Sequence, residues 1–312
     1  MEKQPLFLKP VFQERIWGGT ALKDIFGYDI PSNKTGECWA ISAHPNGMGI
    51  IMNGEYEGQT LKELWDNHRE LFGNVEGEQF PLLTKILDAD DDLSVQVHPD
   101  DKYAFINENG ELGKTECWYI IDCKEEAEMV FGHNAQTKEE MEEMIKKGEW
   151  NEFLRRVKIK PGDFFNVPSG SVHALCKGTL VLETQQSSDT TYRLYDYDRR
   201  DDQGNTRELH LQKSMDVITV PHEEEKLENK VQNLAGAVIT TYVENEFFSV
   251  YKYTIHSSET FKQEKPFLMM SVLEGSGMLN GYSIKKGDHF ILPAGFGDFT
   301  IKGELELMVA SI

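Results

Sequence analysis

One turn-forming pattern occurs twice in this chain of 312 residues and constrains its fold more than any other feature. Lys160-Pro161-Gly162-Asp163 leads through a short apolar run to Pro168-Ser169-Gly170, and the same order recurs in Lys285-Lys286-Gly287-Asp288 and Pro293-Ala294-Gly295. In each copy the glycine turns the chain into a strand, and the Pro-x-Gly triplet makes the tight turn after it. Repetition at this scale predicts two copies of one β-unit.

The first copy also carries a histidine at a fixed distance from its turns. The spacing of Gly162, Pro168, Gly170 and His173 resembles the second motif of the cupin superfamily in full. In the second copy, Asp298 stands where His173 stands in the first. This resemblance implies a mainly β fold with two cupin barrels, of the double-stranded β-helix or jelly-roll type.

We expect the barrels to occupy separate parts of the chain. Residues 1–221 are predicted to form a catalytic, metal-binding cupin domain, residues 222–236 an acidic linker, and residues 237–312 a metal-free cupin domain. The last prediction follows because the stretch from Val272 to Gly277 supplies no His-x-His partner.

Short helices are predicted within the N-terminal half. Thr60 and Glu63 have capping-box spacing and begin an amphipathic stretch that extends to Leu71. A second helix is expected from Thr137 to Gly148. Between them, the strands Leu82–Leu87 and Leu93–His98 are expected to pair as a hairpin.

Polar and apolar side chains alternate along the predicted strand at 93–98, as in a strand with one face towards a cavity. Side chains of a strand point to opposite faces in turn, so Ser94, Gln96 and His98 share one face while the three residues Leu93, Val95 and Val97 share the other. If this strand lines a small barrel, Gln96 and His98 point into its interior. Gln96-x-His98 followed by Glu116 also resembles the first cupin motif, with Gln96 in the place of a first histidine.

These residues form a candidate metal site. His98, Glu116 and His173 offer two imidazoles and one carboxylate, with Gln96 as a neutral fourth ligand. Such a set suits zinc, and it also suits iron(II), which serves oxygen chemistry. The ligand types therefore leave the reaction open.

Composition excludes some partners. The formal net charge of −21 argues against nucleic acid and anionic membranes, and a phosphorylated substrate would need a local cluster of cations. No apolar run of signal-peptide length follows the N-terminus, and no stretch of about 18 apolar residues occurs, so we expect a cytoplasmic protein without a membrane segment. The four cysteines lack metal-site spacing and are interpreted as reduced structural thiols.

Several co-linear motifs resemble the type I mannose-6-phosphate isomerase family in its short bacterial form. They are Trp17-Gly18-Gly19, the stretch from Gly36 to Ser42, the stretch from Pro81 to Ala89, Gln96-Val97-His98-Pro99-Asp100-Asp101, Lys114-Thr115-Glu116 and Tyr192-Arg193-Leu194-Tyr195-Asp196. The resemblance implies interconversion of mannose 6-phosphate and fructose 6-phosphate with one zinc ion per chain. It maps the metal residues of the family onto His98, Glu116 and His173, a further ligand onto Gln96, and the active-site arginine onto Arg193.

The implied chemistry assigns roles to a few residues. Proton transfer between carbons 2 and 1 through an enediol needs a base and positive charge beside the developing oxyanion. We expect Arg193 to stabilise the enediolate or hold the phosphate, and Lys114 to assist by charge or proton transfer. Glu37 and Asp189 are weak candidates for the base. The rival functions are a non-catalytic sugar-phosphate-binding cupin and an iron(II) cupin oxygenase, and the choice between monomer and homodimer stays open.

Overall fold

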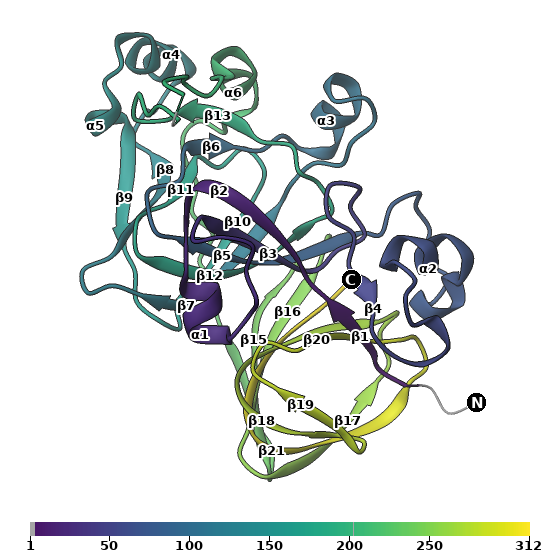
Figure 1. Ribbon diagram of the computed structural model, residues 1–312. Coiled ribbons are helices and arrows are strands. Elements are labelled where there is room, and N and C mark those ends of the chain that lie inside the picture. Colours follow the sequence, from purple (N-terminus) through teal and green to yellow (C-terminus); the bar gives the residue numbers. More distant parts are fainter. Residues whose placement is uncertain (1–3, 202) are drawn as a thin grey trace.

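A computed structural model describes residues 4–201 and 203–312 of the chain. Residues 1–3, the start of the N-terminal stretch for which no signal peptide is expected, lie outside the described residues. Within the described part, the chain folds into three antiparallel sheets, with short helices at their edges (Figure 1). The prediction of a mainly β protein with cupin barrels is confirmed. No helix in the described ranges is long and apolar enough to cross a membrane.

Two sheets face each other in the N-terminal part of the chain. Along the six-stranded sheet the order is β10 (Phe164–Val167), β7 (Glu116–Cys123), β12 (Thr179–Gln186), β5 (Leu82–Ala89), β3 (Thr35–Ile41) and β2 (Val11–Gly19). Along the five-stranded sheet it is β13 (Tyr192–Tyr195), β6 (Val95–Val97), β11 (His173–Leu175), β8 (Glu128–His133) and β9 (Leu154–Lys158).

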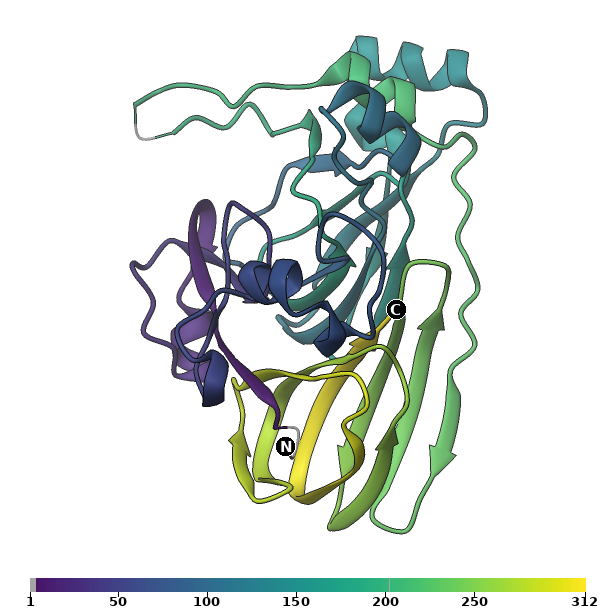
Figure 2. The ribbon, with the colours of Figure 1, turned by 90° about the vertical axis from the view of Figure 1, so that its right-hand side faces the viewer.

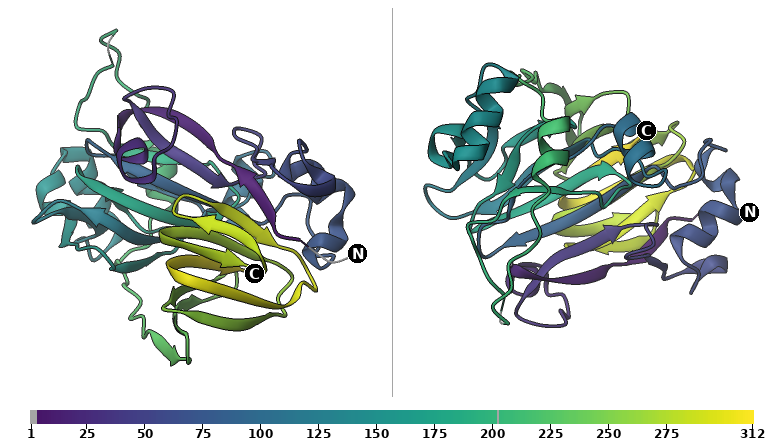
Figure 3. Two further views of the ribbon diagram at one scale, coloured as in Figure 1. Left: turned by 60° about the horizontal axis from the view of Figure 1, so that its bottom comes forward. Right: turned by 90° about the horizontal axis from the view of Figure 1, so that it is seen from above.

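The third sheet builds the second barrel and includes strands from both ends of the chain. Its main path is β14 (Lys230–Asn233), β15 (Ala237–Glu244), β16 (Ser249–Ile255), β21 (Gly297–Ser311), β18 (Leu268–Leu279), β20 (His289–Leu292), β1 (Leu6–Lys9) and β4 (Ile50–Ile51). Two further strands, β17 (Ser258–Gln263) and β19 (Tyr282–Lys285), pair with β21 and β18. The N-terminal strands, purple in Figure 3, therefore run from the first barrel to the second.

This pairing bears on the expected domain division. Strand β1 pairs with β20, so the N-terminal strand belongs to the second barrel in space. Strand β14 lies inside the segment expected to be a linker and pairs with β15. From residue 218 to β14 the chain runs extended along the side of the molecule (Figure 2). The boundaries at 222–236 stay a prediction.

The helices begin where the capping residues place them. Helix α2 (Leu61–Asn67) has the capping box of Thr60 and Glu63, and α4 (Lys138–Lys147) begins after Thr137, whose hydroxyl accepts from the Glu140 amide. The predicted helix at 60–71 is interrupted at His68, after which η2 (Arg69–Phe72) continues as a 3₁₀ turn. The others are α1 (Ala21–Phe26), η1 (Gly54–Tyr56), α3 (Asp101–Asn107), α5 (Trp150–Phe153) and α6 (Leu211–Val217).

The expected hairpin between β5 and β6 is wrong. Both edges of β5 are already paired, one with β12 and the other with β3. The turn after Ala89 therefore carries the chain into the other sheet, where β6 pairs with β11 and β13. This crossing brings the polar face of β6 opposite the charged face of the six-stranded sheet.

The repeated turns have the same construction in both barrels. Gly162 and Gly287 adopt positive φ values of 91° and 89°, which glycine tolerates without strain. The carboxylates of Asp163 and Asp288 accept hydrogen bonds from the backbone amides of Lys160 and Lys285, respectively. The sequence repeat is thus a structural repeat.

A hydrogen-bonded chain, half-buried at Tyr28 and buried at His289 and Ser271, joins the two barrels. The Tyr28 hydroxyl, just after α1, donates to the carbonyl of Gly287 at 2.9 Å and lies 2.7 Å from Nε2 of His289. The other ring nitrogen of His289 lies 2.9 Å from the Ser271 hydroxyl. Burial lowers the pKa of His289 to about 3, so the ring is neutral and needs both partners.

Removing the Tyr28 hydroxyl is therefore expected to destabilise the protein. Tyr28→Phe leaves a buried imidazole nitrogen of His289 without a partner, and we expect the free energy of unfolding to fall by about 1–3 kcal/mol. The measurement is the midpoint of urea denaturation, with the exposed Tyr282→Phe as the control. Equal midpoints for the two variants would show that the chain contributes nothing to stability.

A second prediction concerns Asp88, at the end of β5. Its carboxylate accepts from the Ala21 amide at 2.7 Å, but burial and then the neighbouring Asp90 and Asp24 raise its pKa to about 6. The folded state keeps this proton to higher pH than the unfolded state, so the contribution of Asp88 to stability falls as pH rises from about 4 to 6.

Asp88→Asn should remove this pH dependence. We expect the variant to be more stable than the parent by about 1–3 kcal/mol at pH 7 and equal to it at pH 4. Urea denaturation at both pH values measures this, and the exposed Asp298→Asn serves as the control. A gain that is the same at both pH values would contradict the assignment.

Candidate active site

Three ligand-type side chains converge between the two sheets of the first barrel. Glu116 is the first residue of β7, His173 is the first residue of β11, and His98 directly follows β6. All three are buried, and their ligand atoms lie within 4.8 Å of one another. The structure therefore brings together residues that are far apart in the sequence, as the cupin motifs predicted.

The spacing of these atoms suits a metal ion. The two histidine Nε2 atoms are 3.2 Å apart, and they lie 3.3 Å (His173) and 3.4 Å (His98) from the oxygens of Glu116. Ligand atoms around a tetrahedral zinc with bonds of about 2.0–2.1 Å are separated by about 3.4 Å.

Backbone carbonyls orient both imidazole rings. Nδ1 of His98 lies 2.9 Å from the carbonyl oxygen of Thr190, and Nδ1 of His173 lies 2.9 Å from that of Ser171. These contacts place the proton on Nδ1, so the lone pairs of both Nε2 atoms face the shared point. Burial and then the nearby Lys114 lower the pKa of His98 to about 3, and burial lowers the pKa of His173. Both rings are therefore neutral, as metal ligation requires.

Glu116 also has the properties of a metal ligand. Although burial opposes ionisation, the ammonium group of Lys114 holds the pKa of Glu116 well below its usual range. Among the described residues, neither carboxylate oxygen accepts a hydrogen bond of good geometry, although Lys114 Nζ lies 2.7 Å from Oε2. A buried, charged and under-coordinated carboxylate beside two neutral imidazoles fits a divalent cation.

Gln96 lies at the edge of this group. Its amide nitrogen is 3.3 Å from Nε2 of His173, and the two residues are paired in register across β6 and β11. Because amide oxygen and nitrogen can exchange places by rotation, the oxygen can face the same point. Ligation by Gln96 stays a prediction.

Charges alternate across the six-stranded sheet beside the site. Lys114 Nζ lies 3.9 Å from Glu183, and Lys85 Nζ lies 3.8 Å from both Glu183 and Glu37. Arg15 then pairs with Glu37 at 2.7 Å. No acceptor lies within hydrogen-bond distance of the Lys85 ammonium among the described residues, which leaves its donors available to a ligand.

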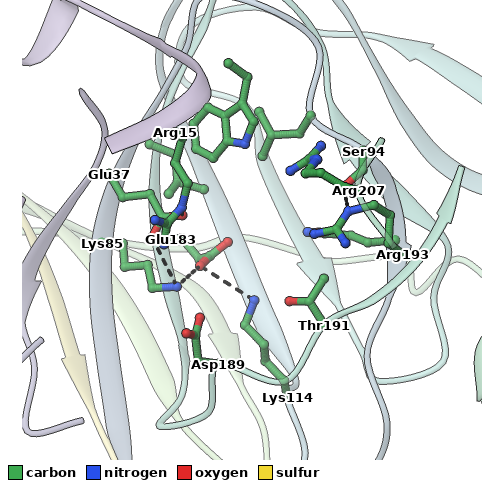
Figure 4. A pocket seen from close by; sticks show the side chains of 14 residues that line it. Arg15, Glu37, Lys85, Ser94, Lys114, Glu183, Asp189, Thr191, Arg193 and Arg207 are labelled. Atoms are coloured by element: carbon green, nitrogen blue, oxygen red, sulfur yellow. Dashed lines mark hydrogen bonds and ion pairs between the residues drawn. The ribbon is translucent and has the colours of Figure 1, made fainter. Parts of the chain in front are cut away.

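These charges line one pocket of about 340 Å³ (Figure 4). Its walls come from both sheets. Among the lining side chains, five are cationic and three are carboxylates. The lining residues are Arg15, Trp17, Glu37, Lys85, Leu87, Leu93, Ser94, Gln96, Lys114, Glu183, Asp189, Thr191, Arg193 and Arg207. The cavity-facing side of β6 is thus the polar one, as its alternation predicted.

Arg193 occupies the wall opposite the charged sheet. Its backbone pairs with that of Gln96, its Nε donates to the Ser94 hydroxyl at 3.3 Å, and its Nη1 donates to the carbonyl of Glu208 at 2.9 Å. Burial and then the charge of Arg207 lower its pKa. Arg193 therefore lies beside the metal group and lines the pocket, while its catalytic role stays a prediction.

The candidate bases differ in availability. Both oxygens of Glu37 are occupied, one by Arg15 and the other by the indole nitrogen of Trp39 at 2.6 Å. Asp189 accepts from the side-chain amide of Asn46 at 2.9 Å, and although burial opposes ionisation, the nearby Lys85 lowers the pKa of Asp189. Neither geometry identifies a base.

Sequence reasoning missed four charged residues of the pocket. Lys85 and Glu183 are charged residues inside otherwise apolar strands, and that interruption was a usable signal. Arg15 and Arg207 lie in polar stretches without periodicity, so no local pattern distinguished them.

Comparison with known proteins places both halves of the chain in one group. A family model of the type I phosphomannose isomerase catalytic domain matches residues 6–146, and a model of the mannose-6-phosphate isomerase cupin domain matches residues 238–312. The chain is 61% identical to mannose-6-phosphate isomerase ManA of Bacillus subtilis and 52% identical to the mannose-6-phosphate isomerase of Streptococcus mutans. These alignments cover 100% of both chains in the first case and 98% of both in the second.

A solved structure agrees with these matches. The crystal structure of a mannose 6-phosphate isomerase from Bacillus subtilis superimposes with a TM-score of 0.97 at 58% identity, and the match covers 99% of this chain and 100% of the other. A putative mannosephosphate isomerase from Archaeoglobus fulgidus, at 22% identity and a TM-score of 0.78, shares the fold.

Proposed function

The chain belongs to the type I phosphomannose isomerase family, and from this membership we propose that its reaction takes place in the pocket of the first barrel, beside one zinc ion. The enzyme interconverts mannose 6-phosphate and fructose 6-phosphate. We propose that His98, Glu116 and His173 hold the zinc and that Gln96 is a fourth ligand. The observation that carries this proposal is the convergence of three buried ligand atoms beside a pocket rich in cations.

The reaction sets the demands on the pocket. An aldose becomes a ketose when a proton moves from carbon 2 to carbon 1 through an enediol, so the site needs a base and positive charge beside the developing oxyanion. When bound, zinc supplies such charge without redox chemistry.

Lys114 and Arg193 add positive charge from two sides of the pocket. Although burial opposes it, Glu116 and Glu183 raise the pKa of Lys114, so its ammonium stays charged next to the metal residues. Arg193, on the opposite wall, stabilises the enediolate or holds the phosphate. Lys85, buried and without a hydrogen-bond acceptor among the described residues, is available to a sugar oxygen.

The charge of the substrate also indicates the compartment in which the enzyme acts. It is a small, doubly charged sugar phosphate, which does not cross a bilayer unaided because burying its charge is costly. We therefore place the enzyme in the cytoplasm and propose neither nucleic acid nor membrane as a partner.

The proposal is tested by following fructose 6-phosphate formed from mannose 6-phosphate in a coupled assay, with oxygen uptake recorded in parallel. We expect turnover of roughly 1–10³ s⁻¹ without oxygen consumption. Binding of mannose 6-phosphate without turnover would favour a non-catalytic sugar-phosphate-binding module. Oxygen uptake in the presence of iron(II) would favour an oxygenase.

A further inference from the structure

A projecting arm contributes one arginine to the pocket. The arm, defined as residues 196–201 and 203–210, leaves β13 and returns to α6, and it stands out from the body of the molecule in Figure 2. Arg200 and Thr206 pair across its two legs. Arg207 lies on the returning leg, and its side chain turns back into the pocket beside Arg193 (Figure 4).

The guanidinium group of Arg207 is fixed from one side. Its Nε and Nη2 donate to the two oxygens of Asp196 at 2.7 and 2.6 Å, a bidentate arrangement. Asp196 is itself buried and also accepts from Arg199 Nη2 at 2.7 Å. No described residue accepts from Nη1 of Arg207. The group is therefore pre-oriented, with donors left over.

Positive charge is in excess at this wall. Arg193, Arg199 and Arg207 lie around the single buried carboxylate of Asp196, and Arg193 forms no ion pair with any carboxylate among the described residues. Arg207 is the charge that lowers the pKa of Arg193 most. In a chain with a net charge of −21, two neighbouring guanidinium groups turned into one pocket form a local site for an anion.

The exposure of the residues along the pocket indicates which end of the substrate lies next to the two arginines. The side chains of Glu116, in the metal group, and of Lys114, beside it, are 0% and 5% exposed, whereas that of Arg207 is 25% exposed. The reacting carbons belong at the buried end, and the phosphate, which does not react, belongs at the more exposed end.

We infer that Arg207 binds the phosphate group of the substrate together with Arg193, and that Asp196 positions Arg207 for this task. The inference rests on the proposed function and adds to it a phosphate subsite at the base of the arm. It also selects phosphate binding from the two roles proposed for Arg193.

The test is Arg207→Gln. We expect KM for mannose 6-phosphate to rise roughly 10- to 100-fold, because a charge-assisted hydrogen bond to the phosphate is lost, while kcat stays within a few-fold of the parent. Inorganic phosphate is the probe for the subsite, and its inhibition constant should rise by a similar factor. Arg207→Lys should fall between the two, because it keeps the charge and loses the planar fork.

Arg200→Gln is the matched control. It removes the same charge from the exposed part of the same arm, and we expect KM and the inhibition constant to stay within about two-fold. Unchanged KM and phosphate inhibition in Arg207→Gln would overturn the inference, as would a fall in kcat alone, which would place Arg207 in the chemistry. If Arg207→Gln does not fold, Arg207→Lys decides by the same readouts.

The subsite and the proposed function can fail separately. If the parent enzyme shows no turnover, the function fails, and calorimetric titration of inorganic phosphate into the parent and into Arg207→Gln still tests the subsite. Weaker binding in the variant would support the subsite, and equal binding would exclude it.

Discussion

Replacing His173 with alanine is expected to reduce isomerase turnover by roughly 10³-fold or more, because the site loses one of its two imidazoles and with it the bound metal charge. His173 contacts His98, Glu116 and Gln96 and is completely buried, so no other side chain can take its place. The measurements are kcat with saturating mannose 6-phosphate and metal content by atomic spectroscopy.

The control for this variant is His68→Ala. His68 lies after α2 against the ring of Tyr56, outside the pocket, so its loss should leave both turnover and metal content unchanged. Retention of more than about a tenth of the activity in His173→Ala, with a full complement of metal, would contradict the assignment of the site.

The second large effect is expected for Arg193→Ala. Loss of this guanidinium should lower kcat/KM by roughly 10²-fold or more, because a charged donor in the pocket is replaced by a methyl group. Because we infer that Arg193 holds the phosphate with Arg207, most of the loss should appear in KM; a loss mainly in kcat would assign Arg193 to the enediolate instead. Steady-state kinetics separate the two.

Arg200→Ala, on the exposed arm, is the control for Arg193→Ala and should behave like the parent enzyme. The fold of Arg193→Ala is checked by its denaturation midpoint, since the Arg193 side chain also contacts Ser94 and the carbonyl of Glu208. A loss of only a few-fold in a properly folded variant would remove Arg193 from the site.

The repeated turns explain why so much of the fold was predictable. Gly162 and Gly287 adopt positive φ, and the aspartate after each closes the turn by accepting a hydrogen bond from a lysine amide, so the turn is encoded within four residues. The helix starts at Thr60 and Thr137 were predictable for the same reason, because each cap depends only on residues within the first turn. The pairing of β1 with β20 and the separation of β5 from β6 depend instead on which strand edges are free in the folded chain, which no local pattern records.

The site, like the fold, contains residues that local motifs predicted and residues that they did not. His98, Glu116 and His173 lie in motifs whose spacing fixes their direction, so the sequence predicted their convergence. Arg207 enters the pocket only because the arm folds back and Asp196 holds its side chain. Contacts of that kind arise from tertiary structure and leave no periodicity to detect.

The most direct test of the account is metal removal and replacement in the intact enzyme. Protein stripped with a chelator should lose conversion of mannose 6-phosphate to fructose 6-phosphate, and one equivalent of zinc per chain should restore it, while His173→Ala stays inactive. Full turnover by the stripped protein, or failure of zinc to restore activity in a chain that is still folded, would contradict the claim that His98, Glu116 and His173 hold a metal needed for isomerisation.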